Sequence, residues 1–489
     1  MADMAVAGMA VAGREALAGE TRPTRTQTAL ELMKFALPTM LGNFLTLINE
    51  FTNTIALGHA GEDSELAAVG LGNMMQNCFG LSVAIGLTNA LDTLVSQAHG
   101  AGENELCVHY LQRGRAIITA QLLWMIPLLC STEVLLLAVG QHPDVAKHAA
   151  SYNRIASFGL FFVMQWQATW SFLRNKGLPN VGAWVAGVTS IFHILWAYIF
   201  IHVFKMGNAG AGAANCTTWA LQFLAGSVIL TCKAPGLGSS ALHLLGVGKE
   251  SFKQWKAYLA IGVPAMLQLC AEWWFWEICA LVIGYLGPTP LAAHVAASNL
   301  VVLLFMPSIS LSYATSSVVG NSIGAMLPMK ARQAAWLAAG LDVLLWTIVV
   351  LILISARKVV AAILTSDEVV QDIAVQLLDI YCVAGYFDNI QTVFGGSLRG
   401  LGLNRAPAVA YLFCFYLISL PLGCCFVWPL QMGVYGLWWS MVVGTALTTL
   451  ILGILLYRVD WTKMALLSEE RIRSNRKEQV TSSTVSPSA

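Results

Sequence analysis

The sequence has 489 residues, of which 57% are hydrophobic and only 11% are charged, and its formal net charge is +1. Soluble domains carry about 25% charged residues, so most of the surface of this chain must face lipid. The near-neutral charge excludes the strongly basic surface of a nucleic-acid-binding protein. We therefore expect an all-α polytopic membrane protein.

Twelve apolar segments are long enough to cross a bilayer, since a transmembrane helix needs about 20 apolar residues. Glycine, proline and charged residues mark the breaks between them. The first six segments are roughly 34–57, 66–95, 113–139, 147–172, 181–203 and 208–231. The other six are roughly 257–285, 290–320, 333–355, 369–398, 406–429 and 434–457.

These segments divide the chain into five parts. We expect a cytoplasmic tail at 1–33, a six-helix N-lobe at 34–231, a cytoplasmic loop at 232–256, a six-helix C-lobe at 257–457 and a disordered cytoplasmic tail at 458–489. Lysine and arginine concentrate in the tails and in alternate loops, which places both termini in the cytoplasm. Neither tail carries a recognisable address, so the plasma membrane and a vacuolar or other organelle membrane remain open.

The two halves of the chain resemble each other. Pro38 and Pro264 begin matching segments 226 residues apart, and Arg174 and Arg399, each preceded by leucine, are 225 apart. The stretch ALDTLVSQAHGA that begins at Ala90 matches ATSSVVGNSIGA 224 residues later. Because each half has an even number of spans, the halves have the same orientation and form parallel repeats. Parallel repeats with a cavity between them are typical of transporters.

Several acidic residues lie deep within the spans, where charge is costly and usually functional. Glu50, Glu272, Glu277 and Asp388 are each about two helical turns or more from a loop, and no basic residue nearby in the sequence can neutralise them. An unpaired carboxylate in a low-dielectric cavity takes up a proton or binds a cation. We therefore predict that these acids couple proton movement to substrate movement. Gln391 follows Asp388 by three residues and shares its helix face.

Other polar residues in the spans are assigned different roles. Asp342 stands outside any motif and is expected to be structural. Asp92 lies at the cytoplasmic end of its span, where we expect a hydrogen-bonded cap or gate. The residues assigned to gating or to structure are Pro38, Asp92, Gln97 and Arg399.

The aromatic residues beside the acids have two possible interpretations. Trp273, Trp274 and Trp276 are too near the middle of a span to belong to an interfacial belt, whereas Trp438 is expected in such a belt. The three tryptophans either pack between helices or form a π-lined wall that would suit a flat organic cation.

Several classes of site have no motif in this sequence. The eleven cysteines contain no CxxC pair, the histidines form no HxxH or HxxxH pair, and no GxxxxGK[ST] loop is present. We therefore expect no metal site, no cofactor, no ATP-driven transport by this chain alone and no enzymatic activity.

Five motifs, taken in order, resemble the multidrug and toxic compound extrusion (MATE) transporters. The most telling one is similar to the EWWxxE pattern of the eukaryotic branch. The motifs are Gly58-His-Ala-Gly61, Leu66-Ala-Ala-Val69, Ala90-Leu-Asp-Thr-Leu-Val-Ser-Gln97 with Gly100-Ala101, Glu272-Trp-Trp-Phe-Trp-Glu277, and Leu398-Arg-Gly-Leu-Gly402.

The resemblance implies twelve transmembrane helices in two six-helix lobes that rock between outward-open and inward-open states. It also implies proton-coupled export of organic compounds, with Glu272, Glu277 and Asp388 lining a cavity in the C-lobe. Two positions depart from relatives. Bacterial members have an aspartate where this chain has Asn53, and animal members have a glutamate at the position of Asn299.

The sequence thus predicts a monomeric antiporter in the lipid bilayer that exports small organic molecules such as organic cations, xenobiotics or secondary metabolites. The coupling ion is expected to be H⁺, with Na⁺ left open. A lipid-linked precursor flippase is the main rival and would need cationic residues in the cavity. A membrane-embedded enzyme would need clustered histidines or paired aspartates at a membrane face.

Overall fold

The computed structural model describes residues 23–60, 63–233, 248–364 and 367–484, in which every regular element is a helix. The helices of the first half are α2 (Arg25–Ala60), α3 (Asp63–Gln76), η1 (Asn77–Leu81), α4 (Ser82–Gly100), α5 (Asn104–Cys130), α6 (Thr132–Ala138), α7 (Pro143–Asn175), α8 (Asn180–Tyr198), η2 (Ile199–Val203) and α9 (Gly207–Lys233). Those of the second half are η4 (Lys249–Phe252), α11 (Trp255–Gly284), α12 (Pro288–Gly324), α13 (Pro328–Leu364), α14 (Glu368–Leu401), α15 (Arg405–Leu412), η5 (Phe413–Ser419), α16 (Leu420–Val427), α17 (Gly433–Arg458) and α18 (Trp461–Thr484).

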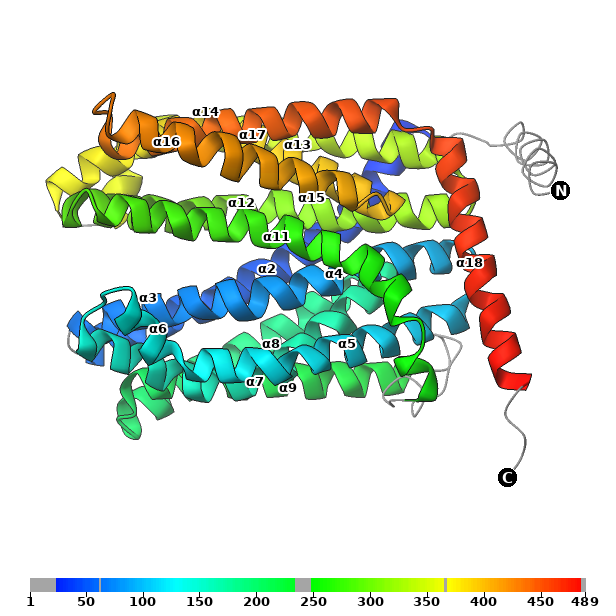
Figure 1. Cartoon of the computed structure of the whole chain (residues 1–489), viewed down its shortest axis with the longest axis horizontal. Coiled ribbons are helices and arrows are strands. Elements are labelled where there is room, and N and C mark those ends of the chain that lie inside the picture. The colour runs from blue at the N-terminus through cyan, green and yellow to red at the C-terminus, as the bar shows by residue number, and fades with distance from the viewer. Residues whose placement is uncertain (1–22, 61–62, 234–247, 365–366, 485–489) are drawn as a thin grey trace.

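These elements form two six-helix lobes, as the sequence predicts (Figure 1). The segments η1, η2 and η5 are π-helical and lie within longer spans, and the third span bends by 56° between α5 and α6. Among the described residues, nine helices are long and apolar enough to cross a membrane, or ten if the bent pair counts as one span. Helices α2 and α7 fall outside this set because they hold polar residues such as Asn49, Glu50, Asn153 and Arg154.

Helix α2 contributes to both lobes. Leu32 and Phe35 near its start belong to the hydrophobic core of the C-lobe. Leu57 near its end packs in the N-lobe together with Tyr152. Pro38 lies between these regions, where proline removes a helix hydrogen bond and favours a kink.

Helix α11 also contributes to both lobes, in the opposite order. Tyr258 and Cys270 in its first part belong to the core of the N-lobe, whereas Phe275 belongs to that of the C-lobe. Pro264 lies within the first part of this helix, as Pro38 does in α2. Each lobe therefore contains the first part of a helix that continues in the other lobe.

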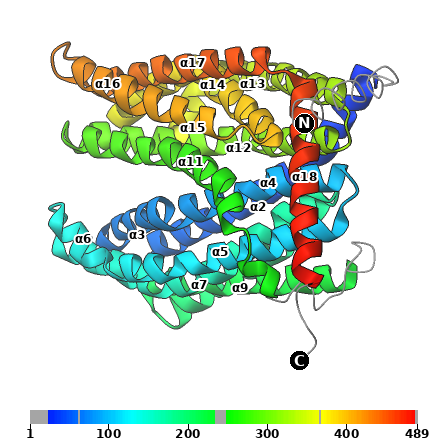
Figure 2. The same ribbon diagram turned by 45° about the vertical axis from the view of Figure 1, so that its right-hand side comes forward.

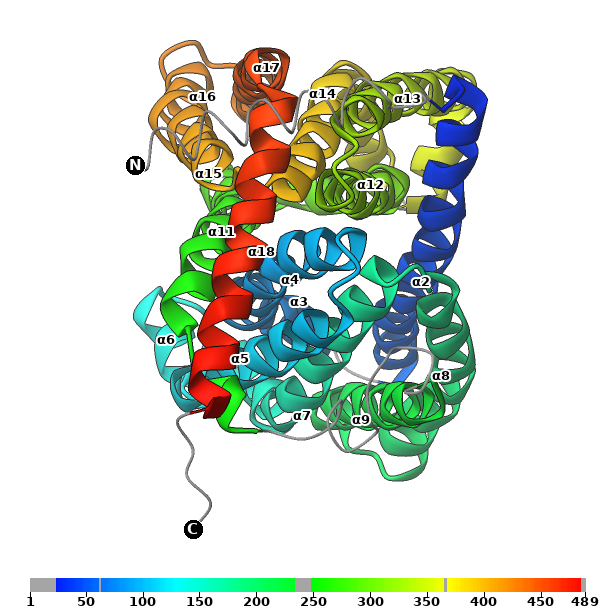
Figure 3. The same ribbon diagram turned by 90° about the vertical axis from the view of Figure 1, so that its right-hand side faces the viewer.

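The prediction of a disordered C-terminal tail is wrong for most of its length, because α18 occupies Trp461–Thr484. Trp461, Met464 and Ala465 join the core of the C-lobe, and Ile472 joins the core of the N-lobe. Figures 1, 2 and 3 show α18 crossing one end of both lobes. Its polar composition predicts disorder when it is considered alone, whereas these tertiary contacts order it as a helix. We call this end of the molecule the α18 end.

The other predicted boundaries change less. Helix α2 already begins at Arg25, inside the predicted N-terminal tail, and η4 and the start of α11 occupy part of the predicted loop between the lobes. Residues 1–22 and 234–247 of these two regions, and Gly61 of the first family-like motif, lie outside the described residues.

Glycines allow close helix packing inside the C-lobe. Helices α12 and α14 cross at Gly396, where an added Cβ would overlap the carbonyl oxygen and the hydroxyl of Ser312. Small residues at such crossings let backbones approach closely in membranes, where van der Waals packing drives helix association. Gly340 in α13 offers a contrast, because an added Cβ there would meet no atom within 4 Å.

We expect Gly396→Ala to lower the thermal unfolding midpoint of the purified protein, because overpacking of this kind costs about 1–3 kcal/mol. Gly340→Ala is the control and should leave the midpoint unchanged or raise it, since alanine favours helix by about 1 kcal/mol over glycine. Intrinsic tryptophan fluorescence in detergent provides the measurement. Equal midpoints for the two variants would contradict this account of the α12–α14 contact.

Candidate functional site

Asp388 lies on α14 inside the C-lobe and is only 4% exposed. Its carboxylate accepts hydrogen bonds from the Tyr381 hydroxyl at 3.3 Å and from the Gln391 side-chain amide at 2.9 Å. Both donors are neutral. The burial of α14 between α12, α13 and α17 therefore holds this carboxyl group in an apolar environment without a directly bonded basic side chain among the described residues.

Glu272 lies on α11 and lines a small cavity, which we call the central cavity. This cavity has a volume of about 30 Å³ and is bounded by residues of α4, α11, α12, α14 and α15, among them Asn89, Trp273, Tyr313, Arg399 and Tyr411. Such a volume holds a few water molecules at most, whereas ligand pockets are typically about 300 Å³ or larger. Glu272 interacts electrostatically with Asp388, so the two acids share one environment.

Glu277 does not join this pair. It is half-buried on α11 and interacts electrostatically with Cys78 of η1, on the side that faces the N-lobe. Five residues correspond to about 140° around a helix, so the two glutamates point in different directions. The structure thus brings Glu272, rather than Glu277, together with Asp388.

The three tryptophans of this segment also separate. Trp273 lines the central cavity, while the indole nitrogen of Trp274 donates to the carbonyl oxygen of Cys78 at 2.9 Å. Trp276 packs against the rings of His294 and Trp438. Three directions from one helix do not make a continuous π-lined wall. Trp438 is only 2% exposed, so its predicted place in an interfacial belt is wrong.

Asn299 lies apart from the carboxylates. It is exposed in a depression of about 450 Å³ that is lined by Pro288, Leu291, Ala292, Val295, Ala296, Asn299 and Val370. This depression lies between the early part of α12 and the start of α14. Asn299 therefore does not line the central cavity, contrary to its predicted grouping with the acids.

Glu50 belongs to a separate polar network in the N-lobe. Asn73 donates to its carboxylate at 3.2 Å and accepts a hydrogen bond from the Tyr152 hydroxyl at 2.6 Å. Asn215 then connects Tyr152 to Asn53 at 2.9 Å each. Asn53 is thus one member of a hydrogen-bonded chain that also includes Asn215, Tyr152 and Asn73.

Asp342 on α13 is predicted to have a structural role, but it lies near the acids that are predicted to be functional. It is fully buried, and the Ser308 hydroxyl donates to its Oδ1 at 2.6 Å. Its Oδ2 has no hydrogen-bond partner among the described residues, and its charge interacts with that of Asp388. The only feature of the sequence that pointed to a functional role for Asp342 was its depth within a span.

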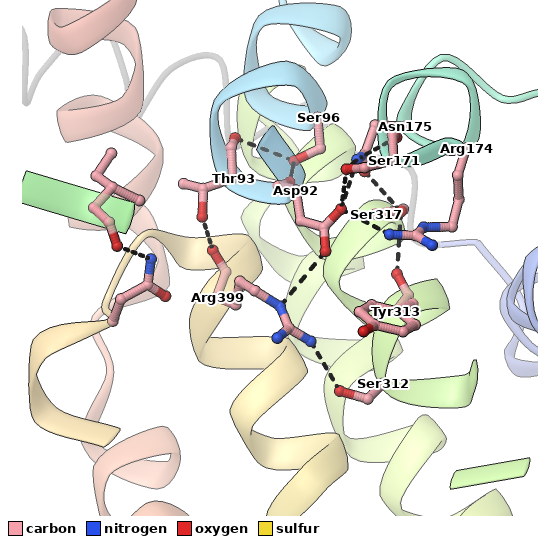
Figure 4. A network of polar contacts seen from close by, with 12 residues as sticks. Asp92, Thr93, Ser96, Ser171, Arg174, Asn175, Ser312, Tyr313, Ser317 and Arg399 are labelled. Carbon is pink, nitrogen blue, oxygen red and sulfur yellow. Dashed lines mark hydrogen bonds and ion pairs between the residues drawn. The ribbon is translucent and has the colours of Figure 1, made fainter. Parts of the chain in front are cut away.

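At the α18 end the lobes meet through a buried network centred on Asp92 (Figure 4). Asp92 is fully buried on α4, and its Oδ1 accepts hydrogen bonds from Ser171 at 2.7 Å and from Arg174 and Asn175 at 2.9 Å. Its Oδ2 lies 3.8 Å from the Nε of Arg399, which comes from the other lobe. We call the following residues the bridging network: Asp92, Ser171, Arg174, Asn175, Tyr313, Ser317 and Arg399.

The two arginines of the bridging network are equivalent positions of the repeats. Both guanidinium groups lie over the ring of Tyr313, with Arg174 at 4.4 Å and Arg399 at 5.3 Å from its centre. Ser317 donates to Asn175 at 2.7 Å, and Thr93 donates to the carbonyl oxygen of Arg399 at 2.5 Å. Each lobe thus contributes one arginine, whereas only the N-lobe contributes the acid.

A second contact between the lobes is nearly symmetric. An added Cβ at Gly100 would overlap the carbonyl oxygen of Asn321, and one at Gly324 would overlap that of Gln97. Gly100 and Gly324 are 224 residues apart, as are Gln97 and Asn321. The tips of α4 and α12 therefore pack against each other through equivalent residues.

Helix α18 fixes the orientation of Gln97. The Ser468 hydroxyl and the Arg471 guanidinium both donate to Oε1 of Gln97, at 2.9 and 3.0 Å, so its Nε2 is left to donate to the carbonyl oxygen of Gly400 at 2.9 Å. Asn475 adds a hydrogen bond to Tyr110 of the N-lobe. Burial lowers the pKa of Arg471, although arginine stays charged at neutral pH.

Metal binding finds no support in the part of the chain that the structure describes. There, no group of three or more histidine, cysteine, aspartate and glutamate side chains could hold a metal ion. The carboxyl groups of the C-lobe lie among tyrosine, glutamine, serine and tryptophan side chains, whose chemistry suits proton exchange or contact with an organic cation.

We expect Asp92→Asn to destabilise the protein by about 3–5 kcal/mol, because the change leaves the buried guanidinium group of Arg174 without its hydrogen-bonded counter-charge. Asp379→Asn is the matched control. Asp379 forms a half-exposed ion pair with Arg357, and such pairs contribute about 0–1 kcal/mol. Chemical unfolding in detergent measures both losses, and a similar loss for the two variants would contradict the role assigned to Asp92.

The MatE family profile matches the chain twice, over residues 38–199 and 264–425. The matches begin at Pro38 and Pro264 and so reproduce the 226-residue repeat. Multidrug and toxin extrusion protein 1 of Danio rerio is 31% identical over 436 residues, which cover 89% of this chain and 73% of the relative. The human protein of the same name is 28% identical over 438 residues, which cover 88% and 75%.

Solved structures agree in fold. The eukaryotic MATE transporter AtDTX14 superposes with a TM-score of 0.87 at 23% identity over 92% of this chain and 99% of that one. A transporter of the MOP superfamily from Pyrococcus furiosus gives 0.78 at 19% identity over 93% and 99%. Two family matches that together cover more than half of the sequence, in the repeat register, establish that the chain belongs to the MatE family of membrane transporters.

Proposed function

We propose that this protein exports small organic molecules, with organic cations as the favoured class, in exchange for protons. Membership of the MatE family and the names of the relatives, which are multidrug and toxin extrusion proteins, support extrusion as the direction of transport. The protein acts as a monomer in the bilayer in this proposal. Its partners are the lipid and the transported molecule.

The observation that carries the proton coupling is the environment of Asp388 and Glu272. Asp388 has neutral hydrogen-bond donors, and Glu272 lies close enough to interact with it electrostatically. Arg399 lines the same cavity and interacts electrostatically with Glu272, but it also faces Asp92, so it cannot balance both Glu272 and Asp388. Two neighbouring carboxylates in a low-dielectric site cannot both stay charged unless cations balance both of them. One of them takes up a proton, or a bound cation supplies the compensating charge.

This competition provides the exchange mechanism. When Glu272 and Asp388 are charged, they attract a cationic substrate, and protonation from the acidic side removes that attraction and releases it. Asp342 extends the carboxyl cluster on the side of α13. Glu277 lies on the side of α11 that faces the N-lobe, where it would contact a substrate that enters between the lobes.

The arrangement of the two lobes corresponds to one stage of this exchange cycle. The bridging network and α18 hold the lobes together at the α18 end, and the ribbons of the lobes diverge toward the opposite end (Figure 1). If both termini are cytoplasmic, as the loop charges predict, the protein is closed to the cytoplasm here. The central cavity is too small for an organic molecule, so substrate binding requires the lobes to separate.

Two alternatives remain testable. A sodium-coupled antiporter would use the same carboxylates or those of the Glu50 network. A lipid-linked precursor flippase needs cationic groups in the cavity, and Arg399 does line it. Arg399 also faces Asp92, however, so it has a structural partner, and this weakens the argument for a pyrophosphate site.

We expect proteoliposomes to accumulate a radiolabelled quaternary ammonium cation when a pH gradient is imposed. The double variant Glu277→Gln/Asp388→Asn should lose on the order of tenfold or more of the gradient-driven rate, because coupling factors between ligands are about 5–150-fold. Single variants Glu272→Gln and Glu277→Gln then show which glutamate acts with Asp388.

Asp379→Asn is again the matched control, since it removes an acid of the same helix that is half-exposed and does not line the cavity. Replacing sodium by potassium at fixed pH separates proton from sodium coupling. Uptake at the wild-type rate in the double variant would refute the proposed role of the C-lobe acids. Uptake that follows sodium rather than pH would refute proton coupling.

A further inference from the structure

Arg399 belongs to two sites at once. Its side chain lines the central cavity beside Glu272 and interacts electrostatically with that acid. The same guanidinium lies in the bridging network, with its Nε 3.8 Å from Asp92 of the other lobe (Figure 4). No other arginine or lysine lines the central cavity within the described ranges.

The bridging network has an unbalanced charge. It holds two guanidinium groups, Arg174 and Arg399, but a single carboxylate, Asp92. A buried charge without a partner is costly, so one of the two arginines needs a second acid. Arg174 already donates to Asp92 at 2.9 Å, which leaves Arg399 as the group with the surplus charge. Glu272 lines the same cavity and interacts electrostatically with Arg399, so it is an acid that can supply this second charge.

The contact between Arg399 and Asp92 is incomplete. At 3.8 Å, the Nε of Arg399 and the Oδ2 of Asp92 are beyond hydrogen-bond distance, and neither atom has another partner among the described residues. The Nη2 of Arg399 donates instead to the Ser312 hydroxyl at 3.1 Å, on the cavity side. The guanidinium therefore stands between two acids and is fully bonded to neither.

We propose that Arg399 is the positioning residue through which protonation of Glu272 controls the contact between the lobes at the α18 end. When Glu272 is charged, it draws Arg399 toward the cavity and weakens the pairing with Asp92, so the lobes separate at this end. When Glu272 is neutral, Arg399 pairs more fully with Asp92, and the equilibrium shifts toward the closed arrangement without abolishing the open one. The inference rests on the proposed function, because it requires Glu272 to take up and release a proton.

The other groups around Arg399 leave Glu272 as the variable acid. Asp92 on α4 is held by three hydrogen bonds, and Arg174 on α7 is bonded to it. Tyr313 on α12 and Tyr411 on α15 complete the surroundings, and phenols are neutral near pH 7. Asp388 lies on the same helix as Arg399, three helical turns away, and acts on Glu272 rather than on the bridging network.

The test is the distance between the lobes at the α18 end as a function of pH. Spin labels at Ala101→Cys and Ala325→Cys mark the exposed tips of α4 and α12, in protein whose exposed Cys232 and Cys425 are replaced by serine. We expect the wild-type ratio of separated to closed populations to rise on the order of tenfold from acidic to alkaline pH. Dipolar broadening of continuous-wave electron paramagnetic resonance spectra, which reports short distances between labels, measures the closed fraction.

Three variants decide the outcome. Glu272→Gln, which imitates the protonated acid, should favour the closed arrangement to the same degree at every pH, and Arg399→Gln should lose the pH response whichever state it favours. Arg399→Lys keeps the positive charge and should retain a smaller response, which separates the charge effect from misfolding. Arg357→Gln is the control for loss of an arginine, because Arg357 pairs with Asp379 at the half-exposed contact away from the network.

A wild-type pH response in Arg399→Gln would overturn the inference, and so would a closed wild-type population at every pH. The uptake assay is read independently of these distances. If a pH gradient drives uptake but the distances do not depend on Arg399, the inference fails and the proposed function stands. If no pH gradient drives uptake in the wild type, the proposed function fails.

Discussion

The structure depends on how buried charges are compensated where the two lobes meet. Asp92 is fully buried, so its charge requires partners, and the partners come from both lobes. Arg174 and Arg399 cannot leave Asp92 without exposing a charge to an apolar interior. This requirement makes the contact at the α18 end specific, since a purely apolar contact would tolerate sliding between helices. It also means that any rearrangement of the lobes must supply a substitute charge.

The two repeats share their backbone arrangement but differ in the polar side chains that they hold. Gly100 and Gly324 pack equivalently, and the equivalent residues Arg174 and Arg399 both lie over the ring of Tyr313. The acids do not follow this symmetry. The C-lobe holds Glu272, Asp342 and Asp388, whereas the N-lobe has amides and a tyrosine around Glu50. A duplicated scaffold thus holds different side chains in its two lobes, with the carboxyl groups that interact with Asp388 in the C-lobe.

Hydropathy and repeat spacing predicted the twelve helices, because a bilayer restricts spans to long apolar helices. The spacing of five residues between Glu272 and Glu277, about 140° around a helix, also accounts for their different directions. The sequence could not predict that α18 is a helix, because its order depends on contacts with Gln97 and Tyr110 that lie more than 350 residues away. Nor could it place Arg399 in the cavity or Asp342 near Asp388, since both depend on which helices pack together.

The exchange of α2 and α11 between the lobes bears on how the chain is made. The core of the N-lobe includes Tyr258 and Cys270 of α11 and Ile472 of α18, which leave the ribosome after the other helices of that lobe. The first half of the protein therefore cannot complete its packing while it is inserted into the membrane. The surface that contacts α11 and α18 stays uncovered until these helices have been synthesised. Because each lobe contains helices from the other half of the chain, the two lobes fold as one unit, although each repeat has as many spans as an independent helix bundle.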